Sequence, residues 1–220
     1  MSWKSHIDTI LPRLSSACFA MKTIKPYFSH QILKVIYCAN FHAIMSYGII
    51  FWGQSSASLK VFLLQKRPIR IKTGCGPRDS CRKLFAELGI LTLPSQYIFS
   101  LLLFTVKNRK LFHVNQDLHS LGTRQQQNFH QPLVNLKKYQ LGPYYMGLKL
   151  YNTLPTFLKT EPHSFVSFRS SLKKKFIGVF NLFHRWVLQY LQTRETKTIR
   201  LGALANFYTT IYLLIADECH

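Results

Sequence analysis

The sequence is poor in acidic residues. Of its 220 residues only eight are Asp or Glu, against 29 Lys or Arg, which gives a formal net charge of +21 at pH 7. The acidic residues are dispersed along the chain except for Asp217 and Glu218. Two-metal phosphoryl transfer needs carboxylates that converge on the ions, and no Asp-Asp pair occurs. We therefore expect no catalytic residue for such chemistry in this chain.

Motifs for metals and cofactors are also missing. No glycine-rich phosphate loop with its terminal Lys-Ser/Thr is present. Cys75 and Cys81 are six residues apart, whereas zinc motifs place their cysteines two to four residues apart. We therefore expect no metal and no cofactor. Five scattered cysteines, an odd number, favour a reducing compartment over a disulfide framework.

No hydrophobic run is long enough to cross a bilayer. The longest runs, residues 97–106 and 203–216, fall short of the roughly 20 residues that a membrane helix needs. Asp8, Pro12 and Arg13 interrupt any secretory signal near the start. We expect no transmembrane segment and a nuclear or cytoplasmic protein that is not secreted, with a mitochondrial presequence as a minor alternative.

Apolar residues make up 47% of the chain, and most of them recur at helical spacing. The sequence predicts an all-α fold, an irregular helical bundle with an extended, loop-rich segment near 113–143. Pro12 and Pro68 are expected to kink or break their helices, and the helix at 31–51 is expected to be buried on nearly all sides. The expected helices cover 4–28, 31–51, 57–72, a short stretch before Gly89, 94–110, 144–153 and 165–178.

The expected domains are 1–112, thumb-like and helical; 113–178, the extended segment with the C-terminal helices; and 179–220, a divergent tail.

The helix at 57–72 carries a cationic side. At 100° per residue, four cations fall within an arc of about 120°, and Val61, Phe62 and Ile69 point away from it. These cations are Lys60, Lys66, Arg67 and Arg70. The pattern predicts a face that follows a phosphate backbone; the alternative is a solvated helix face.

The segment near 113–143 interleaves basic and aromatic residues. Its basic residues include Arg124, Lys137 and Lys138, and its aromatic neighbours are Phe129, Tyr139, Tyr144 and Tyr145. Such a pattern suits single-stranded nucleic acid, whose bases stack on aromatic rings. The alternative is that the aromatic rings anchor the segment to the core. We interpret Lys173, Lys174 and Lys175 as a solvated face.

A series of short motifs in a fixed order supports a more specific interpretation. In the first half these are WKSHI at 3–7, CFA at 18–20, LKVIY at 33–37, YGI at 47–49, WG at 52–53, QKR at 65–67, IR at 69–70, SCR at 80–82 and ILTLPS at 90–95. In the second half they are TR at 123–124, Tyr139, Gly142, Tyr145, Gly147 and YNTLP at 151–155. Together they resemble the part of a jockey-like non-LTR (LINE) retrotransposon reverse transcriptase that follows the polymerase active site. The resemblance covers about residues 2–178.

The resemblance implies the C-terminal, thumb-like region of an RNA-directed DNA polymerase, which grips the template–primer duplex. The catalytic palm is expected to precede this region, so the chain is expected to be inactive alone. RNA or an RNA–DNA duplex would be bound through backbone contacts, and the polymerase palm would be a further partner. Two alternatives stay open, a domesticated stand-alone nucleic-acid-binding protein and a basic protein at anionic membrane surfaces. The genomic flanks separate the first alternative from a retrotransposon origin, and lipid binding tests the second.

Overall fold

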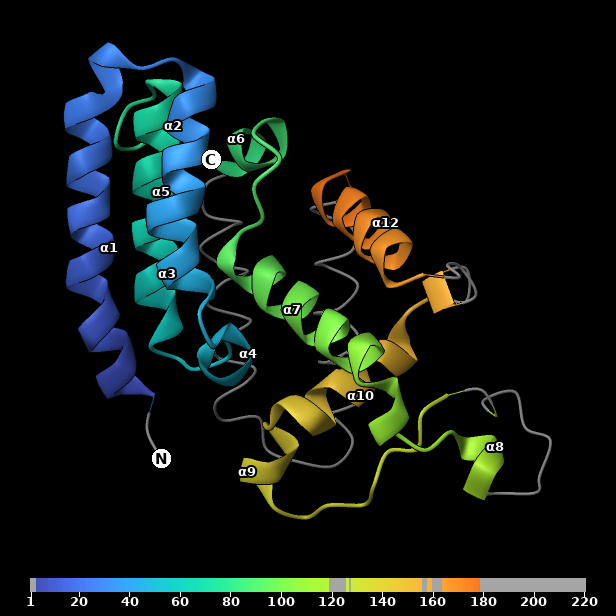
Figure 1. The fold of residues 1–220 in the computed structure, drawn as a ribbon. Coiled ribbons are helices and arrows are strands. Elements are labelled where there is room, and N and C mark those ends of the chain that lie inside the picture. Colours follow the sequence, from blue (N-terminus) through green and yellow to red (C-terminus); the bar gives the residue numbers. More distant parts are fainter. Residues whose placement is uncertain (1–2, 119–125, 127, 156–157, 160–163, 179–220) are drawn as a thin grey trace. The chain divides into compact units, whose positions relative to one another are not determined.

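The computed structural model describes residues 3–118, 126, 128–155, 158–159 and 164–178, and these residues form an all-α fold (Figure 1). The predicted fold class is therefore confirmed. The chain divides into two units between Tyr97 and Ile98, inside helix α7 (Leu93–Lys107). The domain boundary expected at residue 112 stays a prediction. The tail expected at 179–220 lies outside the described residues.

Unit 1 is built around α1 (Lys4–Ile24), a helical rod that follows it, and α5 (Ser58–Thr73), which lie side by side in Figure 1. The buried stripe of α1 follows helical spacing, as predicted, and consists of Ile7, Ile10, Leu14, Cys18 and Met21. Pro12 does not interrupt α1. It is exposed, so the backbone carbonyl that loses its hydrogen bond can turn toward water.

The rod consists of α2 (His30–Ile36), a π-helical turn η2 (Tyr37–His42) and α3 (Ala43–Ser46). It follows the 3-10 turn η1 (Lys25–Tyr27), and the hydroxyl of Ser29 caps α2 by accepting from Ile32 N at 3.5 Å. The prediction that this region is buried nearly all round is wrong. Only one face is covered, through Leu33, Tyr37, Phe41 and Met45, while Ile32 and Val35 are 45% and 67% exposed.

The rod ends at a turn, and the chain then leads into α5. Gly48 has a left-handed backbone (φ 60°) and is followed by α4 (Ile49–Trp52). The indole of the fully buried Trp52 donates to the carbonyl of Tyr47 at 2.9 Å. Pro68 lies inside α5, which continues unbroken to Gly74. The break expected at Pro68 is therefore not observed. Unit 1 also contains α6 (Arg82–Glu87) and the start of α7 (Leu93–Lys107).

Unit 2 contains the rest of α7, η3 (Arg109–Leu111), α8 (Asn115–Leu118), α9 (Lys137–Gln140), α10 (Pro143–Thr153) and α12 (Phe165–Gly178). Gly147 of α10 lies against Thr105 of α7, where any larger side chain would meet the threonine hydroxyl. The rings of Phe99 and Phe176 meet edge to face at 6.2 Å. Close approach of α7 to α10 and α12 thus builds the core of this unit.

The described residues of the segment near 113–143 are largely irregular, as expected, and are fastened to unit 2 at defined points. Val114 and Phe129 form an isolated antiparallel bridge. The side chain of Asn152 pairs with the backbone of Phe129, donating to its carbonyl at 2.7 Å and accepting from its N–H at 3.0 Å. The side-chain amide makes the two hydrogen bonds that a neighbouring strand would make, so the backbone of Phe129 is hydrogen-bonded although the described residues form no sheet here.

Candidate nucleic-acid interface

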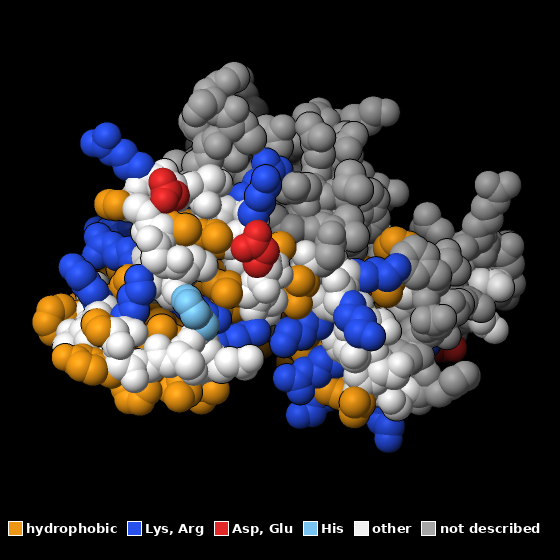
Figure 2. Space-filling model, turned by 90° about the horizontal axis from the view of Figure 1, so that it is seen from above, with side chains coloured by type: hydrophobic (Ala, Val, Ile, Leu, Met, Phe, Trp, Pro, Cys, Tyr) orange, Lys and Arg blue, Asp and Glu red, His pale blue; other side chains and the backbone are white. Residues whose placement is uncertain are grey.

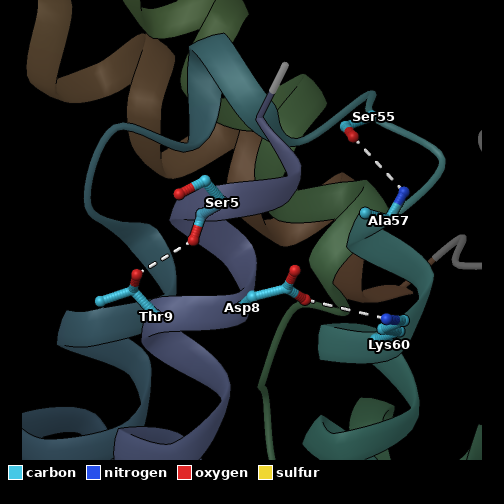
Figure 3. Close-up of polar contacts among 6 residues, drawn as sticks. All are labelled: Ser5, Asp8, Thr9, Ser55, Ala57 and Lys60. Atoms are coloured by element: carbon cyan, nitrogen blue, oxygen red, sulfur yellow. Dashed lines mark hydrogen bonds and ion pairs between the residues drawn. The ribbon is translucent and has the colours of Figure 1, made fainter.

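The exposed side of α5 carries Lys60 and Arg67, two of the four cations that the sequence predicts on one face. They are seven residues, or two turns, apart, which places them about 10 Å from each other along the same side of the helix. Lys60 lies 3.8 Å from Asp8 of α1, in a pair whose side chains are 58% and 46% exposed (Figure 3). Such a solvated pair contributes little to stability, so Lys60 can exchange this partner for a phosphate.

Lys66 departs from the predicted face. It is only 6% exposed, and its ammonium lies 5.4 Å from the centre of the Phe62 ring. The arc of four cations is correct as helical geometry, but α5 is covered on so many sides that only part of the arc reaches solvent. The apolar residues expected to face away, Val61, Phe62 and Ile69, are buried.

Arg70 has a structural partner. Its Nε and Nη2 both donate to the backbone carbonyl of Asp79, at 2.9 and 2.6 Å. The carboxylate of Asp79 in turn accepts from the N–H of Gly76 at 2.6 Å. Arg70 therefore fastens the loop after α5, which begins at Gly74 with a left-handed φ of 79°.

Helix α1 and the η1 turn after it add cations that the sequence interpretation missed. Asp8 lies next to Lys60 and Cys18 lies close to Arg67, so α1 and α5 run in the same direction. Lys22 is exposed one turn beyond Cys18, and Lys25 Nζ is 3.4 Å from the position that a Cβ at Gly74 would occupy. Only the pairing of α1 with α5 brings Lys22 and Lys25 to the end of the helix pair that carries Arg67 and Arg70.

Positive charge dominates the part of unit 1 that carries α1 and α5. Residues 3–97 hold thirteen Lys or Arg and three Asp or Glu. Two of these acids, Asp8 and Asp79, are already engaged by Lys60 and by the Gly76 N–H. Lys and Arg side chains also outnumber acidic ones on the face drawn in Figure 2. We define the basic ridge as the exposed cations Lys22, Lys60 and Arg67, with Lys25 at its end.

Two further lysines of unit 1 serve the fold. Lys34 donates to the carbonyl of Leu88 at 2.6 Å, which links α2 to the end of α6. Lys72 is 5% exposed, and burial together with the nearby Lys34 lowers its pKa. A count of cations therefore overstates the number available to a ligand.

In unit 2 the predicted basic and aromatic residues separate into two groups. Lys137 and Lys138 are exposed on α9, beside Tyr139, which is 48% exposed. Phe129 is 2% exposed and lies 4.7 Å from Tyr151 between ring centres. The guanidinium carbon of Arg109 lies over the Phe129 ring, 5.7 Å from its centre. Phe129 thus anchors the segment to the core, whereas α9 presents the combination of cation and ring to solvent.

The remaining predicted residue, Arg124, lies outside the described residues. Within the part of the chain that the structure describes, no group of three or more His, Cys, Asp or Glu side chains could hold a metal ion. Among the same residues, no helix combines the length and apolar character that crossing a bilayer requires. Comparison with protein-family models, with curated protein sequences and with solved structures finds no match to this chain.

Proposed function

We propose that this protein binds nucleic acid through the phosphate backbone, using the basic ridge of α1 and α5. The observation that carries the proposal is the parallel pairing of the two helices, which brings Lys22, Lys60 and Arg67 to the solvent-exposed side of one helix pair. Cations spaced along one side of a helix pair suit a ligand whose charges repeat along a chain. Binding to the phosphate backbone requires no contact with base edges, so we expect the protein to show little preference for nucleotide sequence.

The resemblance to a reverse transcriptase thumb supports an RNA or RNA–DNA duplex as the ligand. Several residues of the resembling motifs hold the helices together, as a duplex-gripping scaffold requires. Gly53 lies against the ring of Tyr97, Gln65 joins three segments, and Asn152 fastens the extended segment. We infer on this basis that the chain shares its origin with the thumb-like region of a non-LTR retrotransposon polymerase and that a palm is a further partner.

The test measures the affinity of the full chain for a fluorescent RNA–DNA hybrid between 50 and 200 mM salt. Affinity is expected to fall by about a thousandfold over this range, because several phosphate contacts release counterions. The variant Lys22→Ala/Lys60→Ala/Arg67→Ala is expected to flatten the plot of log affinity against log salt by about three units.

A matched control removes the same charges from α12. Arg169→Ala/Lys173→Ala/Lys174→Ala also loses one arginine and two lysines, all of them exposed, and is expected to leave the salt slope nearly unchanged. Equal losses from both triple variants would mean that net charge alone drives binding, which contradicts a defined ridge. A flat salt response of the unaltered chain, or tighter binding to anionic vesicles than to the hybrid, would overturn the proposal.

A further inference from the structure

Two half-exposed aromatic rings lie together at the N-terminal end of α1. The rings of Trp3 and Phe51 are stacked, with centres 6.2 Å apart and planes inclined by 26°. Trp3 is 37% exposed and Phe51 49% exposed. Each ring therefore keeps apolar surface in contact with water although the pair already buries part of its area.

The pair has a rigid support. His6 meets the ring of Trp3 edge to face at 6.1 Å and lies 6.0 Å from the ring of Trp52. Trp52 is fully buried and hydrogen-bonded to Tyr47. Phe51 precedes it in α4, whose other anchor Ile49 is 2% exposed. Because both neighbouring anchors are buried, the side chain of Phe51 lies on the outer side of α4.

Cations lie at the same end of unit 1. Lys4 follows Trp3 directly, and Lys60 pairs with Asp8, which is five residues or about 7.5 Å further along α1. Exposed aromatic rings at the same end of a domain as several cations suit unpaired bases, which stack on the rings while their phosphates are neutralised. A duplex offers no free base face except at its end, whereas a single strand offers one at each nucleotide.

We propose that the Trp3–Phe51 pair is a stacking site for an unpaired base of a single-stranded segment. This inference rests on the proposed function and adds a second kind of contact to it, since the basic ridge binds phosphates and the ring pair binds a base. Stacking on aromatic side chains is sequence-tolerant, because every base has a π face. The ligand class is therefore single-stranded RNA or DNA, including the unpaired end of a duplex.

The experiment compares a uridine 12-mer with an abasic 12-mer that has the same number of phosphates, both with the full chain. The uridine oligomer is expected to bind about five- to 150-fold more tightly, the range for stacking of one base. Trp3→Leu/Phe51→Leu should remove that difference without changing the salt slope, and Trp3→Phe should retain most of it. Phe28→Leu is the control, because Phe28 is 44% exposed at the other end of α1.

The outcomes separate the two proposals. Equal affinity of the unaltered chain for both oligomers, or an equal loss in Phe28→Leu, would overturn the stacking site and leave the ridge intact. Absence of salt-dependent binding to either oligomer would overturn the proposed function itself. A third outcome is that the chain binds anionic vesicles more tightly than the uridine oligomer, and that Trp3→Leu/Phe51→Leu lowers only the affinity for vesicles. The rings would then contact lipid, and the inference would be wrong.

Discussion

Gln65 donates a hydrogen bond from Nε2 to the hydroxyl of Tyr37, at 3.0 Å, in the buried interior of unit 1. The same nitrogen donates to the carbonyl of Leu91 at 3.0 Å, and Oε1 accepts from the N–H of Leu93 at 2.8 Å. One amide therefore ties α5 to the π-helical turn and to the beginning of α7. Because α5 is fixed in this way, Lys60 and Arg67 are left on its solvent side.

Replacing Gln65 by Ala should destabilise unit 1. The change leaves three buried polar groups without their partner, each of which costs about 1 to 3 kcal/mol. We expect the free energy of unfolding in urea to fall by about 3 kcal/mol or more. Gln31→Ala changes the same residue type at an exposed position of α2 and should cost less than about 1 kcal/mol. Similar losses at both positions would show that the network contributes little.

Gly147→Ala should weaken the contact between α10 and α7. The new methyl group meets the hydroxyl of Thr105, which donates to the carbonyl of Leu101 at 3.0 Å. We expect a loss of about 1 to 3 kcal/mol, as for other overpacked sites. In a Thr105→Ala background the obstructing oxygen is gone, so the same glycine change should cost clearly less. Additive effects in this double-mutant cycle would contradict the close contact.

Lys66 and Arg67 are adjacent cations, one buried and one exposed, so replacing each in turn tests whether a cation must be exposed to contribute to binding. Lys66→Met keeps an unbranched chain of similar length in the buried position and should leave both the affinity for the RNA–DNA hybrid and its salt slope unchanged. Arg67→Met removes an exposed cation and should lower the slope by about one unit. Equal reductions of the slope would mean that Lys66 leaves its place over Phe62 to reach the ligand.

The uncovered face of the α2–α3 rod should give the protein poor solution behaviour. Ile32 and Val35 are 45% and 67% exposed, next to the exposed Ala39 and Ala43. Contiguous apolar surface of this kind promotes association. We expect self-association and dye binding by the unaltered chain, both reduced in Ile32→Gln/Val35→Gln.

The same double variant should change the free energy of unfolding by less than about 1 kcal/mol, because its side chains are exposed. Leu33→Gln, at a position 1% exposed, is the matched change on the covered face and should be severely destabilising. A monodisperse parent chain that binds no hydrophobic dye would show that this face is not a patch.

The thiol of Cys18 should make stability fall at alkaline pH. Burial raises its pKa to about 11 from 9.0, and Arg67 opposes part of this effect. The folded state therefore holds the proton more tightly than the unfolded state. The contribution of the protonated thiol to the free energy of unfolding is fully present below pH 9. It is lost as the pH rises through 11, and the total loss is about 2 to 3 kcal/mol. Urea unfolding of the parent and of Cys18→Ala, compared at pH 8 and pH 11, checks this: the difference between the two proteins should shrink at pH 11.

Local rules account for what could be read from the sequence. The spacing of Ile7, Leu14 and Cys18 predicted both a helix and its covered side, because helical geometry alone sets which residues share a face. Ser29 and Gly74 mark helix ends for reasons that lie within a few residues of chain. The excess of cations follows from composition and needs no fold.

Other features depend on segments distant along the chain. On the rod at 30–46 two apolar stripes compete, and only packing against α1 and α5 decided that Leu33 is buried and Val35 exposed. On α5 the helical period could not distinguish Lys66 from Arg67, because burial depends on the neighbours that surround the helix. Lys22 belongs to the basic ridge only because α1 lies parallel to α5. Periodicity fixes directions around one helix axis, whereas solvent exposure is a property of the contacts between helices, and these form only in the tertiary structure.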